Sequence, residues 1–220
     1  MSSAVQPVWD LHVRLFHWLL AALIGLSWWT AENDELEIHM YSGFAILTLI
    51  IFRLLWGVFG SSTARFRNFV RGPRAVLAHI RDSRAWKAAG HNPLGALSVI
   101  AMLVVLKLQV ATGLVNADDD GLAEGPLAAT VGEAATEFAH QAHNLLFDLL
   151  LVLIALHLAA ILFYLLDRRN LVGPMVTGKA PLDASAEPMR PGKWWVALLC
   201  LVAAIALTRW VIAGAPPFGA

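Results

Sequence analysis

One stretch limits what this chain can fold into more than any other, the apolar run from His140 to Leu166. A helix crosses a bilayer with about 20 predominantly apolar residues, and this run is longer than that. It nevertheless carries two histidines, His143 and His157, fourteen residues apart. At about 100° and 1.5 Å per residue, both imidazoles leave nearly the same helix face, roughly 21 Å apart along the axis. Ionisable residues inside a membrane are rare and usually functional, so the stripe predicts a functional group near each end of the span.

The composition agrees with a membrane protein, since 58% of the 220 residues are hydrophobic and only 15% are charged. We predict an all-α polytopic fold in a single membrane domain over residues 1–220, a four-helix transmembrane bundle plus a fifth transmembrane helix. The predicted spans are about residues 15–30, 38–59, 94–115, 140–166 and 194–213, with an interfacial amphipathic helix over about residues 73–84. No cleavable signal peptide is expected. Cys200 is the only cysteine, which excludes disulfides and covalent CxxCH haem attachment.

Charges segregate between the predicted loops. The loops after the first and third spans hold acids and no bases: Glu32, Asp34, Glu35, Glu37, Asp118, Asp119, Asp120, Glu124, Glu133 and Glu137. The loops after the second and fourth spans hold the bases Arg65, Arg67, Arg71, Arg74, Arg81, Arg84, Lys87, Arg168, Arg169, Lys179, Arg190 and Lys193. Lysine and arginine mark the cytoplasmic side, so we predict an N-terminus inside and a C-terminus outside. This topology explains the basic loop without nucleic-acid binding.

Four histidines sort by depth under this topology. His17 and His157 fall near the inner surface, and His39 and His143 near the outer surface. Each pair comes from two different helices, as a haem iron with two axial histidines requires. A single interfacial histidine is more simply a snorkelling polar group. Four that match in depth and face favour bis-histidine haem ligation instead.

The other histidines lack this match. His140 lies seventeen residues from His157 and points about 100° away from the face of His157, so it is rejected as a ligand. It can still line the outer surface near the haem edge. His12, His79 and His91 are predicted to be solvated. The tryptophans Trp9, Trp18, Trp56, Trp194 and Trp195 are interpreted as interface anchors.

Two glycines and three cations complete the predicted site. Gly25 and Gly43 fall close to the faces of His17 and His39, where they would let a flat macrocycle approach the backbone; packing of helices by small residues is the alternative. Lys107 is predicted either to pair with Asp148 at similar depth or to neutralise a propionate of the outer haem; its alternative is to snorkel outward. The remaining cations, Arg14 and Arg53, can bind inner-haem propionates or a quinone head group, or can simply be held at the interface.

Several segments carry a family resemblance: WDLHVRLFHW, HMYSGFAILTLIIFRLLWGVFG, HNPLGALSVIAMLVVLKLQVATGL and HQAHNLLFDLLLVLIALH. Together they resemble the bacterial cytochrome b561 family, and more narrowly the b-type cytochrome subunits of nickel–iron hydrogenases, thiosulfate reductases and formate dehydrogenases. The resemblance covers about the first four spans, and the fourteen-residue histidine spacing is its most specific element. It implies two non-covalent haems b, the inner one on His17 and His157 and the outer one on His39 and His143.

The resemblance also implies a function in the bacterial cytoplasmic (inner) membrane, electron transfer between a partner redox protein and membrane quinone. The acidic outer face suits a hydrogenase-like or other dehydrogenase, or a cytochrome c. We expect the quinone near His17, Arg14, Arg53 and His157, and no catalytic residue is assigned. The alternative is a self-sufficient superoxide:quinone oxidoreductase, but anionic superoxide favours a cationic funnel, which only Lys107 and Arg209 offer. A structural anchor without cofactors leaves the four histidines unexplained.

Overall fold

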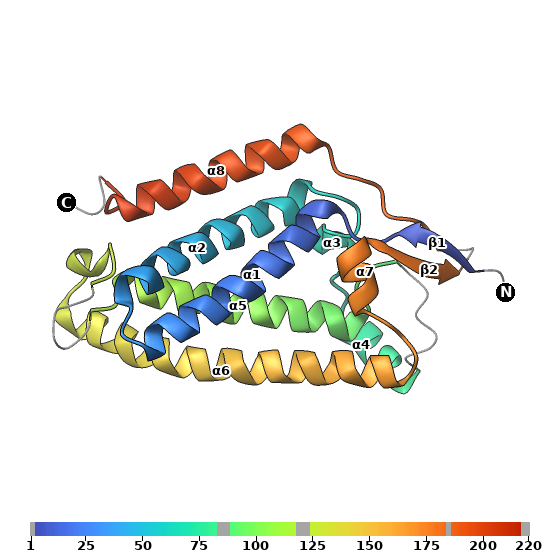
Figure 1. Cartoon of the computed structure of the whole chain (residues 1–220), viewed down its shortest axis with the longest axis horizontal. Helices are drawn as coiled ribbons and strands as arrows, with labels where there is room; N and C mark the ends of the chain where they lie inside the picture. The colour runs from blue at the N-terminus through green and yellow to red at the C-terminus, as the bar shows by residue number, and fades with distance from the viewer. Residues whose placement is uncertain (1–2, 83–88, 118–123, 184–185, 217–220) are drawn as a thin grey trace. The chain divides into compact units, whose positions relative to one another are not determined.

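Five long helices make up most of the chain in the computed structural model, which describes residues 3–82, 89–117, 124–183 and 186–216 (Figure 1). They are α1 (Leu11–Glu32), α2 (Leu36–Phe59), α5 (Pro93–Val115), α6 (Glu133–Leu166) and α8 (Trp194–Ile212). Each is long and apolar enough to cross a membrane. The prediction of an all-α polytopic membrane protein is confirmed.

The helix ends follow local chemistry. Asp10 caps α1, because its Oδ1 accepts a hydrogen bond of 2.8 Å from the backbone N–H of Val13. Helix α6 begins at Glu133, before the apolar run, since the intervening residues are rich in the good helix formers glutamate and alanine. Its 34 residues measure about 51 Å, well over the roughly 30 Å of a hydrocarbon core. The polar first turns of α6 therefore extend beyond the apolar span.

Two short strands were not predicted. Strands β1 (Ser3–Pro7) and β2 (Lys179–Asp183) pair antiparallel, with Ser3 opposite Asp183 and Pro7 opposite Lys179. Each strand has five residues, which is too short for a clear alternating pattern, and their pairing joins opposite ends of the sequence.

Short helices fill the connections. They are α3 (Phe66–Phe69), α4 (Pro73–Arg81), η1 (Ala128–Thr130) and α7 (Val172–Thr177). Helix α4 occupies most of the predicted interfacial helix, and Asp82 follows as its C-cap. The rest of that prediction, residues 83 and 84, lies outside the described residues, as do Lys87 and the acids Asp118, Asp119 and Asp120.

The chain divides into two compact units. The first unit comprises Met1–Phe16, Arg53–Met102 and Leu153–Leu199, and the second comprises His17–Phe52, Leu103–Val152 and Cys200–Ala220. Within the first unit, Trp56 and Ala64 have no exposed surface; within the second, Ile50 and Leu150 are 2% and 3% exposed.

Candidate functional site

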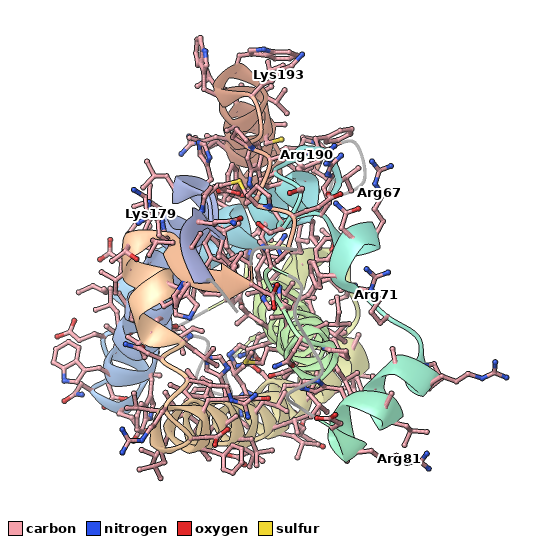
Figure 2. All side chains as sticks on the ribbon, turned by 90° about the vertical axis from the view of Figure 1, so that its right-hand side faces the viewer. Arg67, Arg71, Arg81, Lys179, Arg190 and Lys193 are labelled. Carbon is pink, nitrogen blue, oxygen red and sulfur yellow. The ribbon has the colours of Figure 1, made fainter. Side chains whose placement is uncertain are left out.

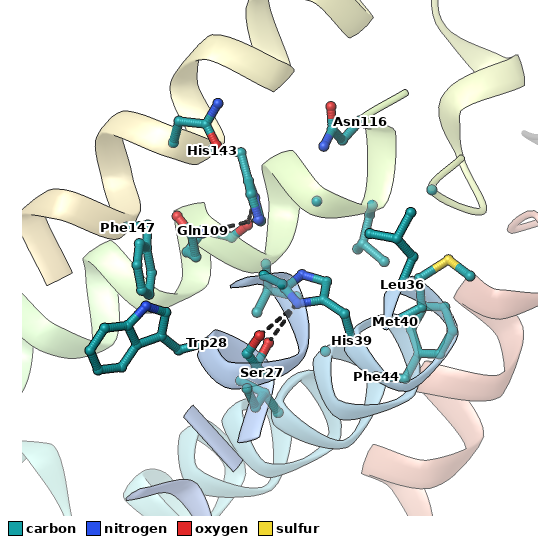
Figure 3. Close-up of a pocket in the computed structure, with 18 of the residues that line it drawn as sticks. Ser27, Trp28, Leu36, His39, Met40, Phe44, Gln109, Asn116, His143 and Phe147 are labelled. Atoms are coloured by element: carbon teal, nitrogen blue, oxygen red, sulfur yellow. Dashed lines mark hydrogen bonds between the residues drawn. The ribbon is translucent and has the colours of Figure 1, made fainter. Parts of the chain in front are cut away.

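The second unit contains a cavity of about 480 Å³ lined by residues of α1, α2, α5 and α6 (Figure 3). Cavities of roughly 300–1,000 Å³ commonly hold small molecules and cofactors. The lining is mostly apolar, and its polar groups include His39, His143, Gln109 and Asn116. Figure 3 shows His39 and His143 reaching toward one another from α2 and α6.

The separation of these two imidazoles suits a shared metal. Their ring centroids lie 6.3 Å apart, with an interplanar angle of 77°. A histidine nitrogen binds a metal ion at about 2 Å, so two imidazoles on opposite sides of one iron have centroids roughly 6 Å apart. The rings therefore lie at a distance that fits a haem iron between them.

The hydrogen bonds of His39 fix its tautomer. Its Nδ1 lies 2.8 Å from the carbonyl oxygen of Ser27 and 3.3 Å from the Ser27 hydroxyl. A carbonyl oxygen can only accept, so Nδ1 carries the hydrogen and Nε2 keeps its lone pair. A histidine that binds a metal usually donates its other N–H to a carbonyl or carboxylate in this way.

His143 is held in the same tautomer by α5. Its Nδ1 lies 3.0 Å from the carbonyl oxygen of Gln109 and 3.2 Å from the hydroxyl of Thr112. The side-chain amide of Gln109 donates to Nε2 at 3.1 Å, while the Oε1 of this amide is buried and has no hydrogen-bond partner. The lone pair of Nε2, which the amide N–H meets here, is the one that a haem iron would take.

Two glycines shape the cavity wall differently. A Cβ added at Gly43 would meet no protein atom within 4 Å, whereas a Cβ at Gly113 would lie 3.0 Å from Cε1 of His143. Gly43 therefore leaves bare backbone where a flat macrocycle can lie, and Gly113 leaves room for the imidazole itself. A Cβ at Gly25 also meets open space, but Gly25 is outside the lining of this cavity.

Sequence reasoning missed the residues that orient the histidines: Ser27, Gln109, Thr112 and Gly113. Ser27 and Gln109 act through backbone carbonyls, which leave no mark in a sequence. The one available signal was Gln109 itself, an uncharged polar residue within an apolar span and only 9% exposed.

The other predicted residues of the second unit are one that lines the cavity and two that do not. His140 lines the cavity, with its Nδ1 3.3 Å from Oδ1 of Asn116. The side chains of Lys107 and Asp148 are exposed on their helices and form no ion pair with each other, so the predicted pairing is wrong. A long lysine stem can carry its ammonium toward the interface without a partner. The propionate role of Lys107 stays a prediction.

The second predicted histidine pair is divided between the units. His17 belongs to the second unit, where its ring meets that of Trp18 edge-on at 4.8 Å. His157 belongs to the first unit. That these two share a haem stays a prediction from the sequence.

The first unit contains a buried polar network around Asp10, which is 8% exposed. Besides capping α1, its carboxylate accepts hydrogen bonds from the Ser61 hydroxyl and, at 3.2 Å, from the indole N–H of Trp56. Trp56 is fully buried and Trp9 is 9% exposed, so the prediction that both are interface anchors is wrong. The Asp10 carboxylate gives the Trp56 indole N–H a hydrogen-bond partner inside the protein.

The predicted cations of the first unit are held by backbone groups. Arg53 is 3% exposed and donates to the Ala64 carbonyl at 3.2 Å, with its guanidinium carbon 4.8 Å from the ring centroid of Phe66. Arg14 donates to the Val176 carbonyl at 2.5 Å. Both arginines keep further N–H groups that can serve an anionic group, and their cofactor roles stay predictions.

Two histidines predicted to be solvated pack into the first unit, where His79 is buried and His91 is intermediate in exposure. His91 packs between Trp9 and Phe69, at ring-centroid distances of 4.6 and 4.7 Å. Burial, together with the nearby Arg53, lowers the pKa of His91 to about 3. His79 is 4% exposed, and burial lowers its pKa below the usual range, as does the charge of Arg169. These predictions fail because the connection between α2 and α5 packs back onto the unit.

The third histidine predicted to be solvated, His12, is partly exposed to solvent. Its side chain is 33% exposed, and its ring centroid lies 4.8 Å from that of Trp56.

Five described helices are long and apolar enough to cross a membrane, and the cavity offers two oriented imidazoles as ligands for a metal-centred cofactor. The family model of prokaryotic cytochrome b561 matches residues 8–178, and the chain belongs to this family. It is therefore a multi-pass membrane cytochrome of the b type, which binds haem and takes part in electron transfer. A comparison with curated proteins and one with solved structures found no match.

Proposed function

We propose that this protein is a di-haem b cytochrome that transfers electrons between a partner redox protein and the membrane quinone pool. The observation that carries the proposal is the pair His39 and His143, whose rings lie 6.3 Å apart beside a cavity. In both residues Nδ1 donates to a backbone carbonyl, which leaves Nε2 with its lone pair, and in His143 this lone pair accepts from the Gln109 amide N–H. A bound haem supplies one-electron redox chemistry, and the chain supplies its axial ligands, its orientation and a dry apolar lining.

Each residue has a defined part in this arrangement. His39 and His143 would hold the outer haem, with the carbonyls of Ser27 and Gln109 keeping both imidazoles in the ligating tautomer. The bare backbone at Gly43 would lie against the macrocycle.

The inner haem would be held by His17 and His157. Arg53 and Arg14 offer N–H donors for its propionates or for a quinone head group, and Gly25 would lie against this macrocycle.

The topology that we propose places the N-terminus in the cytoplasm of a bacterium and the acidic loops in the periplasm. Four described acids lie where α1 ends and α2 begins, with no base among them: Glu32, Asp34, Glu35 and Glu37. Such a face attracts a basic partner, a cytochrome c or a docked dehydrogenase, in a salt-sensitive manner. The superoxide:quinone alternative is disfavoured, because Lys107 is exposed on α5 rather than part of the cavity lining.

The test is a count of haem per polypeptide by pyridine haemochrome on detergent-purified protein. We expect two haems b in the wild type and one in His143→Ala. The matched control is His140→Ala, which removes an imidazole one turn away from the same helix and should keep both haems. Two haems retained in His143→Ala would contradict the ligand assignment, and a folded wild type without haem would contradict the function.

A further inference from the structure

The segment that connects α2 to α5 in the sequence carries both exposed cations and exposed aliphatic side chains. We define the α3–α4 surface by six exposed residues of the first unit: Arg67, Arg71, Arg74, Leu77, Ile80 and Arg81. All six lie outside the long apolar helices. Figure 2 shows Arg67, Arg71 and Arg81 projecting outward beside α3 and α4.

Helix α4 presents three distinct faces. His79, at 4% exposure, turns toward the protein, whereas Leu77 and Ile80 are 56% and 60% exposed. At about 100° per residue, Leu77 and Ile80 lie roughly 60° apart, and Arg74 and Arg81 lie within about 20° of each other beside Leu77. The exposed side of α4 is thus an aliphatic stripe flanked by a cationic stripe.

The cations of this surface are not neutralised by the protein. Residues 60–82 contain five arginines and one acid, Asp82. Within the described part of the chain, Arg67, Arg71, Arg74 and Arg81 form no ion pair. Membrane topology accounts for arginines in a cytoplasmic loop, but it does not account for aliphatic side chains exposed beside them.

We propose that the α3–α4 surface binds anionic phospholipid. Leu77 and Ile80 enter the boundary between headgroups and acyl chains, and the arginines donate to the lipid phosphates. The inference rests on the membrane location alone and is independent of the haem ligands.

The headgroup part is tested by native mass spectrometry of the holoprotein in detergent, titrated with phosphatidylglycerol or with phosphatidylcholine of equal acyl chains. The test variant is Arg71→Gln, Arg74→Gln and Arg81→Gln combined. The control removes three exposed cations of the same unit, as Arg168→Gln, Lys179→Gln and Arg190→Gln. We expect the test variant to lose at least fivefold in phosphatidylglycerol affinity, with the control near wild type. Equal affinities for both lipids in the wild type, or equal losses in both variants, would overturn the proposal.

The depth of α4 is tested with Leu77→Cys carrying an environment-sensitive fluorophore in nanodiscs that contain phosphatidylglycerol. The wild type is the labelling control, because its one cysteine, Cys200, is buried. We expect blue-shifted emission and quenching by lipids brominated on the acyl chains. Water-like emission without quenching would overturn the proposal and leave this surface free for an acidic protein.

Discussion

The two units of the molecule treat their buried polar groups in opposite ways. In the first unit, the Asp10 carboxylate meets three donors at once: the Val13 N–H, the Ser61 hydroxyl and the Trp56 indole. In the second unit, His39 and His143 satisfy one ring nitrogen each with a backbone carbonyl and turn the other side of the ring to a cavity.

This difference distinguishes buried polar groups that stabilise the fold from buried polar groups that can bind a ligand. A carboxylate whose donors all come from the protein stabilises the fold and has little capacity for a ligand. Imidazoles oriented through Nδ1 beside a cavity keep the capacity that a metal needs. Substitutions in the two units should therefore act on different observables, stability in one and haem binding in the other.

The largest effect is expected from Asp10→Ala. The substitution removes the cap of α1 and leaves the Trp56 and Ser61 donors buried without their acceptor, a loss of about 3–5 kcal/mol in the free energy of unfolding. The measurement is thermal or denaturant unfolding in detergent, with haem counted in the folded fraction. Asp10→Asn, which can still accept from Val13, should lose less.

A loss of haem without a loss of stability in Asp10→Ala would contradict the distinction between the two units. If Asp10→Ala unfolded like the wild type but bound less haem, the network in the first unit would belong to a cofactor site.

The long helices could be predicted from the sequence because hydropathy alone determines which segments enter a bilayer. Strands β1 and β2 could not, since two five-residue segments at distant positions carry no local signal of their pairing. Depth also failed for Trp56 and His91. The interface rule assumes that side chains near the membrane surface meet water. Trp56 instead donates to Asp10 and packs on His12, and His91 packs between Trp9 and Phe69.

The site was predictable only in part. The spacing on α6 and the loop charges predict that His39 and His143 lie at one level, and their rings are 6.3 Å apart. The carbonyls of Ser27 and Gln109 were not predictable, because every residue has one and only the packing decides which carbonyl meets an imidazole. Ligand types carry a sequence signal, whereas the groups that orient them through the backbone do not.

Gly43→Ala should produce the second-largest effect, and it acts on haem alone. The added methyl meets no protein atom within 4 Å, and alanine is the better helix former, so the unfolding free energy of the polypeptide should stay level or rise by up to about 1 kcal/mol. The methyl instead fills space that the macrocycle would use, and overfilling a packed contact costs about 1–3 kcal/mol. Haem content should fall toward one per polypeptide, measured by pyridine haemochrome.

Gly113→Ala is the matched control in the same cavity. Its methyl would lie 3.0 Å from Cε1 of His143, so the imidazole must shift while haem is retained. A changed midpoint potential with unchanged haem content is expected. If Gly43→Ala kept both haems with an unaltered spectrum, the cavity wall at Gly43 would not face the macrocycle.

The smallest expected effect is a pH dependence carried by His91. The pKa of His91 is about 3 in the folded protein, against about 6.5 for an unperturbed histidine. Between these values the unfolded chain binds more protons than the folded protein, so stability is complete above about pH 6.5 and declines as the pH falls. Lowering the pH from about 7.5 to about 5.5 should cost about 1.4 kcal/mol through this one group.

His91→Phe isolates that contribution, because an apolar ring between Trp9 and Phe69 has no proton to gain. Unfolding measured at both pH values should show a smaller acid loss in the variant than in the wild type, by about 1.4 kcal/mol. An equal acid loss in both proteins would mean that the His91 ring reaches solvent when protonated. His91 would then be excluded from the closed polar core that distinguishes the first unit from the open site of the second.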